Sequence, residues 1–88
     1  MEVVSTGGSM SGPSKFLIRS NFSPARIKAL RLRLGAGQAV FARLMGVSRG
    51  LVQSWEQGVR QPSLLARRLL EEMQNDPRRW QRMIRRAA

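Results

Sequence analysis

The chain has 88 residues, 16 of them Lys or Arg and five Asp or Glu, and its formal net charge is +11. It contains no Cys and no His, which excludes disulfides, thiolate nucleophiles and Cys-ligated zinc, and removes the commonest general base. Five carboxylates offer little material for acid/base chemistry, so we expect no catalysis, no metal and no cofactor. No apolar run approaches the ~20 residues that span a bilayer, so we expect no membrane partner.

The first 22 residues are predicted to form a flexible or extended N-terminal arm. Residues 1–14 are rich in Gly and Ser and show no apolar period. Phe16, Ile18 and Phe22 follow in the next segment. They fit either a strip that packs back on the core or an arm that binds a partner, and the sequence leaves both interpretations open.

Helical signals begin at Ser23, which suits an N-cap, with Pro24 at the first helical position. An apolar stripe follows at i, i+3 and i+7, formed by Ile27, Leu30 and Leu34. Gly35 is expected to end this helix.

Two shorter helices come next. Residues 38–45 are predicted to form a helix that turns Phe41, Ala42 and Met45 inward and ends at a left-handed Gly46. Ser48 caps the following helix, which Gly58 ends. At about 100° per residue one side of that helix is apolar and the other is polar with no acid. The apolar side consists of Leu51, Val52 and Trp55.

A fourth helix is predicted from about Ser63 to Gln74, with an apolar stripe at i, i+4 and i+8 formed by Leu65, Leu69 and Met73. Asp76, before Pro77, is expected to cap a last basic helix that carries Trp80 and Ile84. The chain is therefore predicted to be all-α, with a helical domain over residues 23–76 and a basic C-terminal helix over 77–88.

The charge is concentrated in two segments. Residues 15–34 hold six cations and no acid, and residues 77–88 hold five Arg and no acid. Fourteen of the 16 cations are Arg, whose planar guanidinium suits bidentate contact with phosphate and guanine. This distribution favours a nucleic-acid partner over a merely solvated surface, and we expect the flanks to contribute affinity rather than sequence preference.

Two helices joined by a three-residue turn that contains Gly form a helix-turn-helix unit. The segment QAVFARLMGVSRGLVQSWEQGVRQPS resembles the Cro/phage-repressor-like helix-turn-helix family, the xenobiotic-response-element class. The resemblance covers about residues 24–74 and implies a five-helix, lambda-repressor-like fold that binds double-stranded DNA.

The resemblance also implies roles for individual residues. The positions that contact bases are Arg49, Gly50, Gln53 and Ser54. The expected phosphate contacts are Gln38, Arg43, Ser48, Gln57 and Arg60. A structural ion pair is expected between Arg31 and Glu56, and Trp55 is expected in the core.

Three features depart from the family pattern. Gly37 stands where Ser or Thr usually caps the second helix, so its phosphate contact is expected to rely on backbone amides. Gly50 offers no side chain at a base-contacting position. Val40 and Leu44 are unexpectedly apolar for exposed positions and suggest a second contact surface.

The family resemblance predicts a cytoplasmic, nucleoid-associated transcriptional repressor that binds an inverted-repeat operator as a homodimer. The variant FARLMGVS with VQSWEQG most resembles host-inhibition (HigA-like) antitoxins. That implies a type II toxin-antitoxin pair with a ribonuclease toxin as partner. Two alternatives remain open: a non-specific nucleic-acid-binding module and a protein-binding adaptor on the same fold.

Overall fold

The computed structural model describes residues 22–87, and this part of the chain contains five helices and no strand. In chain order the helices are α2 (Pro24–Arg33), α3 (Gln38–Met45), α4 (Arg49–Glu56), α5 (Leu64–Asn75) and α6 (Pro77–Ala87). The all-α, five-helix prediction is confirmed. The predicted arm lies outside the described residues except for Phe22, which is buried.

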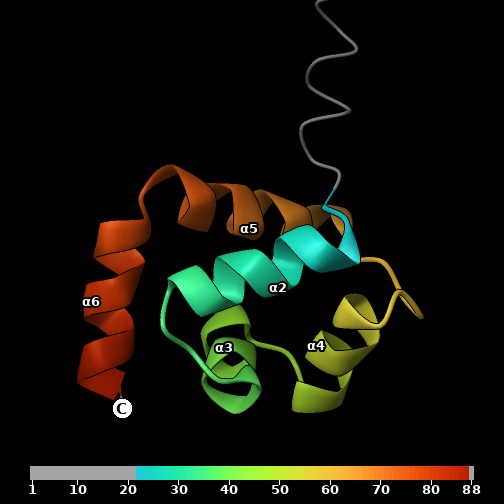
Figure 1. Ribbon diagram of the computed structural model, residues 1–88, viewed down its shortest axis with the longest axis horizontal. Helices are drawn as coiled ribbons and strands as arrows, with labels where there is room; N and C mark the ends of the chain where they lie inside the picture. Colours follow the sequence, from blue (N-terminus) through green and yellow to red (C-terminus); the bar gives the residue numbers. More distant parts are fainter. Residues whose placement is uncertain (1–21, 88) are drawn as a thin grey trace, which may run out of the picture.

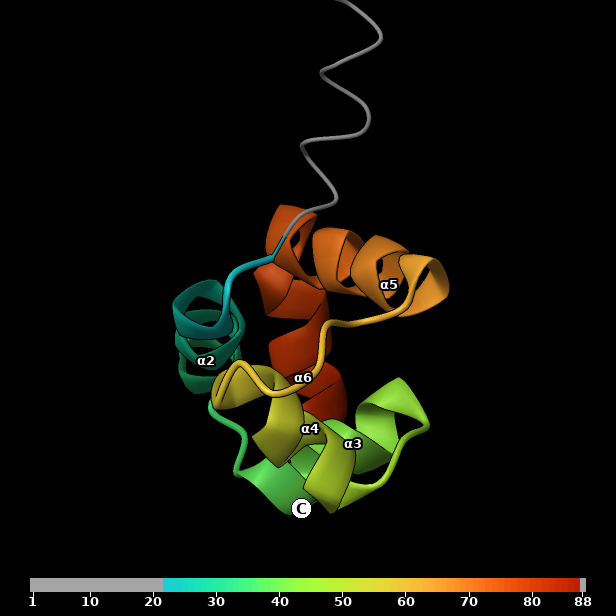
Figure 2. The same cartoon turned by 90° about the vertical axis from the view of Figure 1, so that its right-hand side faces the viewer.

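Helix α2 lies at the centre of the domain and packs against α4 and α5 (Figure 1). Helix α5 covers one side of α2, whereas α3 and α4 lie on the other side. The α3–α4 pair forms one end of the domain in both views (Figures 1 and 2). Helix α6 packs against both α3 and α5 and so closes the domain at the end of α2. This arrangement leaves the outer face of α4 uncovered.

The predicted N-caps form the expected local hydrogen bonds. The hydroxyl oxygen of Ser23 accepts from the amide of Arg26 at 3.2 Å, and that of Ser63 accepts from the amide of Ala66 at 3.2 Å. Asp76 Oδ1 accepts from the Arg79 amide at 3.4 Å. Helix boundaries were predictable here because a cap satisfies backbone donors only three residues away.

The inward faces of the first three described helices are also confirmed. The buried apolar residues of α2, α3 and α4 include Ile27, Leu30, Phe41, Ala42, Met45, Val52 and Trp55. Leu34, the C-cap of α2, is buried with them. Trp55 belongs to this core and is only 2% exposed, so its ring is not accessible for stacking on a base.

The predicted apolar stripe of α5 is wrong in part. Leu65 is 79% exposed and Leu69 is half-buried, whereas Leu70 and Met73 are fully buried. The inward face follows Ala66, Leu70 and Met73, at i, i+4 and i+7, and Leu65 lies about 100° or more away from it. Both stripes have helical spacing, and packing against α2 selects one of them.

The proposed second contact surface on α3 is also corrected. Val40 and Leu44 are half-buried and pack against the core rather than standing exposed. Helix α6 packs on α3. The apolar character of these two positions therefore fits the packing of the domain.

Candidate nucleic-acid interface

The α3–α4 pair is held at a fixed angle by its short turn. Gly46 adopts φ +73°, a left-handed conformation that strains residues with a Cβ. The Val47 amide donates to the Ala42 carbonyl at 3.0 Å, and Ser48 begins α4 immediately afterwards. Ala42 is 3% exposed at this contact, and its small side chain lets the two helices approach closely.

Helix α4 is anchored on one side and open on the other. Val52 and Trp55 fix it to the core at 0% and 2% exposure. The Ser48 hydroxyl oxygen accepts from the Leu51 amide at 3.1 Å, so this oxygen serves as the cap. The backbone of the helix is therefore rigidly placed before any ligand arrives.

The open side carries the residues predicted to contact bases. Arg49 and Gly50 are exposed, and Gln53 and Ser54 are half-buried along the same helix. A Cβ at Gly50 would meet only the Ser48 hydroxyl, at 3.9 Å, so close packing does not require glycine here. The absent side chain instead leaves the α4 backbone accessible at that point.

A chain of hydrogen bonds joins α2, α3 and α4 beneath this face. Arg31 and Glu56 form the expected ion pair, with Arg31 Nε donating to Glu56 Oε2 at 2.6 Å and Nη2 to Oε1 at 3.0 Å. Gln38 Nε2 donates to Glu56 Oε1 at 3.3 Å. Gln53 Nε2 donates in turn to Gln38 Oε1 at 3.3 Å. The ion pair thus leads through Gln38 to Gln53, a side chain predicted to contact bases.

The sequence predicted the two ends of this chain and missed its middle. Gln38 was expected at a phosphate, and in the structure its amide bridges Glu56 and Gln53. A side-chain amide can do this because it carries both a donor and an acceptor. No sequence pattern reveals the link, since Gln38 and Gln53 belong to different helices.

The ion pair also neutralises the charge of Glu56, the acidic residue at the end of α4. The Arg31 guanidinium hydrogen-bonds the Glu56 carboxylate and lowers the pKa of that carboxyl below its usual value of 4.5, with a smaller opposing contribution from burial. Gln38 stabilises the same charge. Arg31 Nη1 also donates to the Ala36 carbonyl at 3.0 Å, which fixes the turn before α3. Glu56 therefore stays ionised and neutralised at neutral pH.

Three of the expected phosphate contacts are exposed, in α3, at the end of α4 and in the loop that follows. Arg43 is exposed in the last turn of α3, Gln57 is the exposed C-cap of α4, and Arg60 is exposed in the following loop. Gly37 gives α3 no side-chain cap, as predicted, so the first amides of α3 face outward without a side-chain acceptor. Such amides suit a phosphate oxygen.

The loop after α4 is shaped by local hydrogen bonds. The amides of Val59 and Arg60 both donate to the Ser54 carbonyl, at 2.9 and 3.3 Å, and Gly58 adopts φ +76° to allow this. Val59 is 70% exposed beside Arg60, a position that the sequence interpretation did not include. The sequence signal for this exposed position was an apolar residue directly after Gly58.

A helix-turn-helix family model matches residues 27–71, from α2 into α5, which is more than half of the chain. The chain belongs to the helix-turn-helix family. Its members are DNA-binding regulators of the Cro/phage-repressor type. The matched residues include all of α3 and α4. Comparison with curated proteins and comparison with solved structures each give no match.

Two further properties of the described residues bear on function. Within residues 22–87 no three His, Cys, Asp or Glu side chains come together in a way that could hold a metal ion. No helix in that same range has the length and apolar character to cross a membrane.

Proposed function

We propose that this helix-turn-helix protein is a sequence-specific transcriptional repressor that binds an inverted-repeat operator as a homodimer in the cytoplasm, on the nucleoid. The observation that carries the proposal is the α4 face, which is anchored by Val52 and Trp55 and positioned by the hydrogen-bond chain from Arg31 to Gln53. A rigid helix with polar groups on its open face is what base recognition in a major groove requires.

The two kinds of contact predict different effects on binding. Arg49 and Gln53 carry side chains of the types that form bidentate bonds to guanine and adenine, each worth about 1–3 kcal/mol of discrimination. Arg60, outside α4, would contact phosphate and carry no sequence information. The α4 side chains should therefore set the preference, and the surrounding cations the general affinity.

Selection from a randomised duplex library, followed by titration of the selected and a scrambled duplex at fixed salt, tests the proposal. We expect the selected duplex to bind about 10³-fold or more tightly than the scrambled one. Arg49→Ala should reduce that ratio, whereas Arg60→Ala should weaken both duplexes alike. Equal affinity for every duplex would favour a non-specific nucleic-acid module, and no affinity at low salt would favour a protein-binding adaptor.

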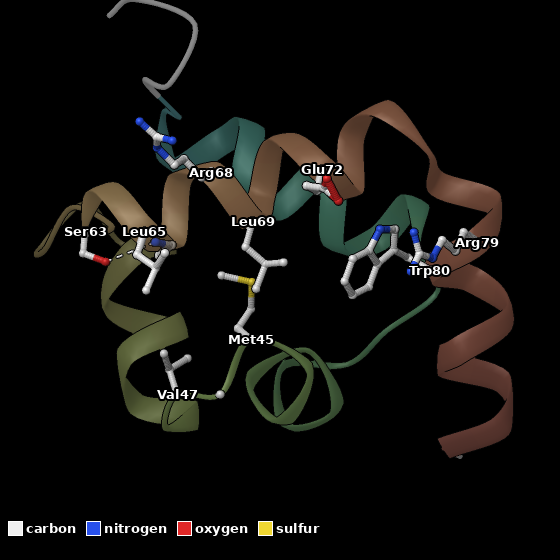
Figure 3. A pocket seen from close by; sticks show the side chains of 11 residues that line it. Met45, Val47, Ser63, Leu65, Arg68, Leu69, Glu72, Arg79 and Trp80 are labelled. Carbon is white, nitrogen blue, oxygen red and sulfur yellow. Dashed lines mark hydrogen bonds between the residues drawn. The ribbon is translucent and has the colours of Figure 1, made fainter.

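An inverted repeat requires two copies of the domain, and the outer face of α5 fits a second copy. The exposed Leu65 and the half-buried Leu69 border a groove of about 610 Å³ between α5, the α3–α4 turn and α6 (Figure 3). None of the base-contacting residues lines this groove. A second copy could therefore occupy it without covering the α4 face.

The charges on this face are complementary to those of an identical face. Arg68 and Glu72 are exposed and lie one turn apart on α5. Two α5 helices packed antiparallel about a two-fold axis bring Arg68 of each copy beside Glu72 of the other, with Leu69 of each copy between them. An acidic or a basic partner would match only one of these charges.

The assembly state of single and double charge-reversal variants tests this interface. Arg68→Glu and Glu72→Arg should each weaken the dimer at least tenfold in sedimentation equilibrium, because each places like charges together. The double variant should restore it. A dimer unaffected by both single variants, or a monomer at all concentrations of the wild-type protein, would contradict the interface.

The antitoxin role extends the same proposal to a ribonuclease toxin. It is supported by the resemblance of FARLMGVS and VQSWEQG to host-inhibition antitoxins. Co-expression with the product of a neighbouring reading frame should give a stable complex that has lost ribonuclease activity. A neighbouring product without such activity, or one that the protein does not inhibit, would leave the repressor role without the antitoxin role.

A further inference from the structure

The two basic segments of the sequence meet in the folded domain. Arg33 is at the end of α2, and α6 passes beside it 48 residues later in the chain. Gln81 Nε2 donates to the main-chain oxygen of Arg33 at 2.8 Å, which ties α6 to the end of α2. Figure 1 shows α6 extending from α5 past this end towards the level of α3.

Helix α6 separates its apolar and basic residues completely. At about 100° per residue its five arginines occupy an arc of roughly 120°; they are Arg78, Arg79, Arg82, Arg85 and Arg86, and all are exposed. On the other side Ile84 is 4% exposed and Trp80 is half-buried against the core. The packing of the apolar side therefore directs the basic side outward.

A hollow of about 250 Å³ lies where α6 meets the α2–α3 turn. It is lined by Arg33, Leu34, Gly35, Gln81, Ile84 and Arg85. Leu34 and Ile84 are buried residues, whereas both arginines are exposed. The hollow thus presents two guanidinium groups and one amide and contains no acid.

These cations have no internal counter-charge. Within residues 22–86 the ion pair that the structure contains joins Arg31 to Glu56, and neither Arg33 nor any α6 arginine forms one. Two like charges on one small hollow repel each other, and an anion placed between them removes that repulsion. The site is therefore better suited to a polyanion than to water alone.

The hollow also lies close, along the chain, to the start of α3. Gly35 lines it, and two residues later Gly37 is the N-cap of α3, whose first amides have no side-chain cap. A DNA strand whose phosphate rests on those amides would pass the hollow next. Guanidinium groups suit phosphate because they form paired, parallel hydrogen bonds.

We propose that Arg33 and Arg85 bind a backbone phosphate of the DNA that flanks the half-site, with Arg82 and Arg86 following the same strand. This inference rests on the proposed DNA-binding function and adds a second surface to it. The α4 face would recognise sequence, and the Arg33–Arg85 hollow would lengthen the footprint without changing the preferred sequence.

The salt dependence of binding by the full chain tests the inference. Each phosphate contact contributes about −0.9 to the slope of log K against log salt concentration. Arg33→Gln and Arg85→Gln should each make the slope less negative by up to about 0.9. Each should also lower the affinity for the selected and the scrambled duplex by the same factor. Arg85→Lys keeps the charge and should retain most of the slope.

Arg78→Gln is the matched control, because Arg78 lies on the same face of α6 two turns away and outside the hollow. It removes the same charge and should change the slope less than Arg85→Gln. Shortening the duplex beyond the half-site should weaken wild-type binding but have little effect on Arg85→Gln. Circular dichroism would verify that each variant is folded.

Equal slope changes for Arg78→Gln and Arg85→Gln would overturn the inference, because they would indicate a general charge effect. Unchanged DNA binding by Arg85→Gln would also overturn it. A wild-type protein that binds all duplexes equally would contradict the proposed repressor function, yet the slope comparison would still test the hollow.

Discussion

The α4 face and the Arg33–Arg85 hollow belong to one small domain but are built in opposite ways. Beneath the α4 face every charge is compensated, and Gln38 joins the Arg31–Glu56 pair to Gln53. At the hollow two arginines share a surface that contains no acid, and a hydrogen bond from Gln81 to Arg33 ties α6 to α2. The first arrangement favours geometric precision, and the second favours attraction to any polyanion.

This difference explains how a chain with a net charge of +11 could still recognise sequence. Cations that contact phosphate add affinity and contribute no discrimination. Placing them on α6, away from the helix that would contact bases, separates affinity from specificity. Variants on the two sides should therefore behave differently in stability as well as in binding.

The largest expected effect comes from breaking the ion pair beneath the α4 face. Glu56→Gln leaves Arg31, whose side chain is 10% exposed, without its counter-charge, and should lower the free energy of unfolding by about 3 kcal/mol. Urea denaturation measures this loss. Arg82→Gln on α6 is the contrasting variant and should change stability by less than about 0.5 kcal/mol, because Arg82 is exposed. Equal losses would remove the distinction between the two regions.

A smaller loss is expected from enlarging the contact between α3 and α4. Ala42→Leu should destabilise the domain by about 1–3 kcal/mol, because a 3% exposed alanine has no room for a larger side chain. The same substitution at the exposed Ala39, also on α3, is the control and should be close to neutral. Thermal unfolding followed by circular dichroism measures both. Destabilisation by Ala39→Leu alone would contradict the assigned packing.

Lowering the pH should reduce the stability of the domain by less than Glu56→Gln does. The pKa of Glu56 is lower in the folded than in the unfolded chain, so its contribution to stability is present above about pH 4.5 and is lost as pH falls through the folded value. The loss is smaller because the lowered pKa keeps part of Glu56 ionised in the folded chain below pH 4.5, whereas the substitution removes the charge entirely. Urea midpoints between pH 6 and pH 3 should fall less steeply for Glu56→Gln than for the wild-type protein. Parallel curves would show that other groups control acid stability.

The smallest effect is expected at the uncapped start of α3. Gly37→Ser should raise stability by a few tenths of a kcal/mol, because a serine hydroxyl can accept from the α3 amides and a Cβ there meets nothing within 4 Å. The hydroxyl would occupy amides that are free for a phosphate, so DNA affinity should not rise with stability. Thermal melts and duplex titrations measure the two quantities. A loss of stability would contradict the open geometry at Gly37.

Local signals in the sequence predicted most of the fold. Ser23, Ser48 and Ser63 cap the helices at the expected positions, and Gly46 adopts the expected left-handed conformation. These features depend on atoms within a few residues of each other. The Arg31–Glu56 pair was also expected, although from family resemblance rather than from spacing.

The sequence was less informative about which helical faces meet. It could not distinguish Leu65 from Leu70 as the inward residue of α5, because both belong to stripes with helical spacing. The half-burial of Val40 and Leu44 was missed for a similar reason, since it depends on how the helices pack around α3. Each of these outcomes depends on a surface from another part of the chain.

The same distinction applies to the charge. The sequence by itself determined that the chain is strongly basic, that its cations lie in two flanking segments, and that helices of suitable length surround a helix-turn-helix. Only the tertiary structure decided that Arg33 and Arg85 line one hollow and that Gln38 joins Glu56 to Gln53. Composition and local spacing fix what each segment contains, whereas its neighbours are fixed by long-range packing of apolar faces around a shared core.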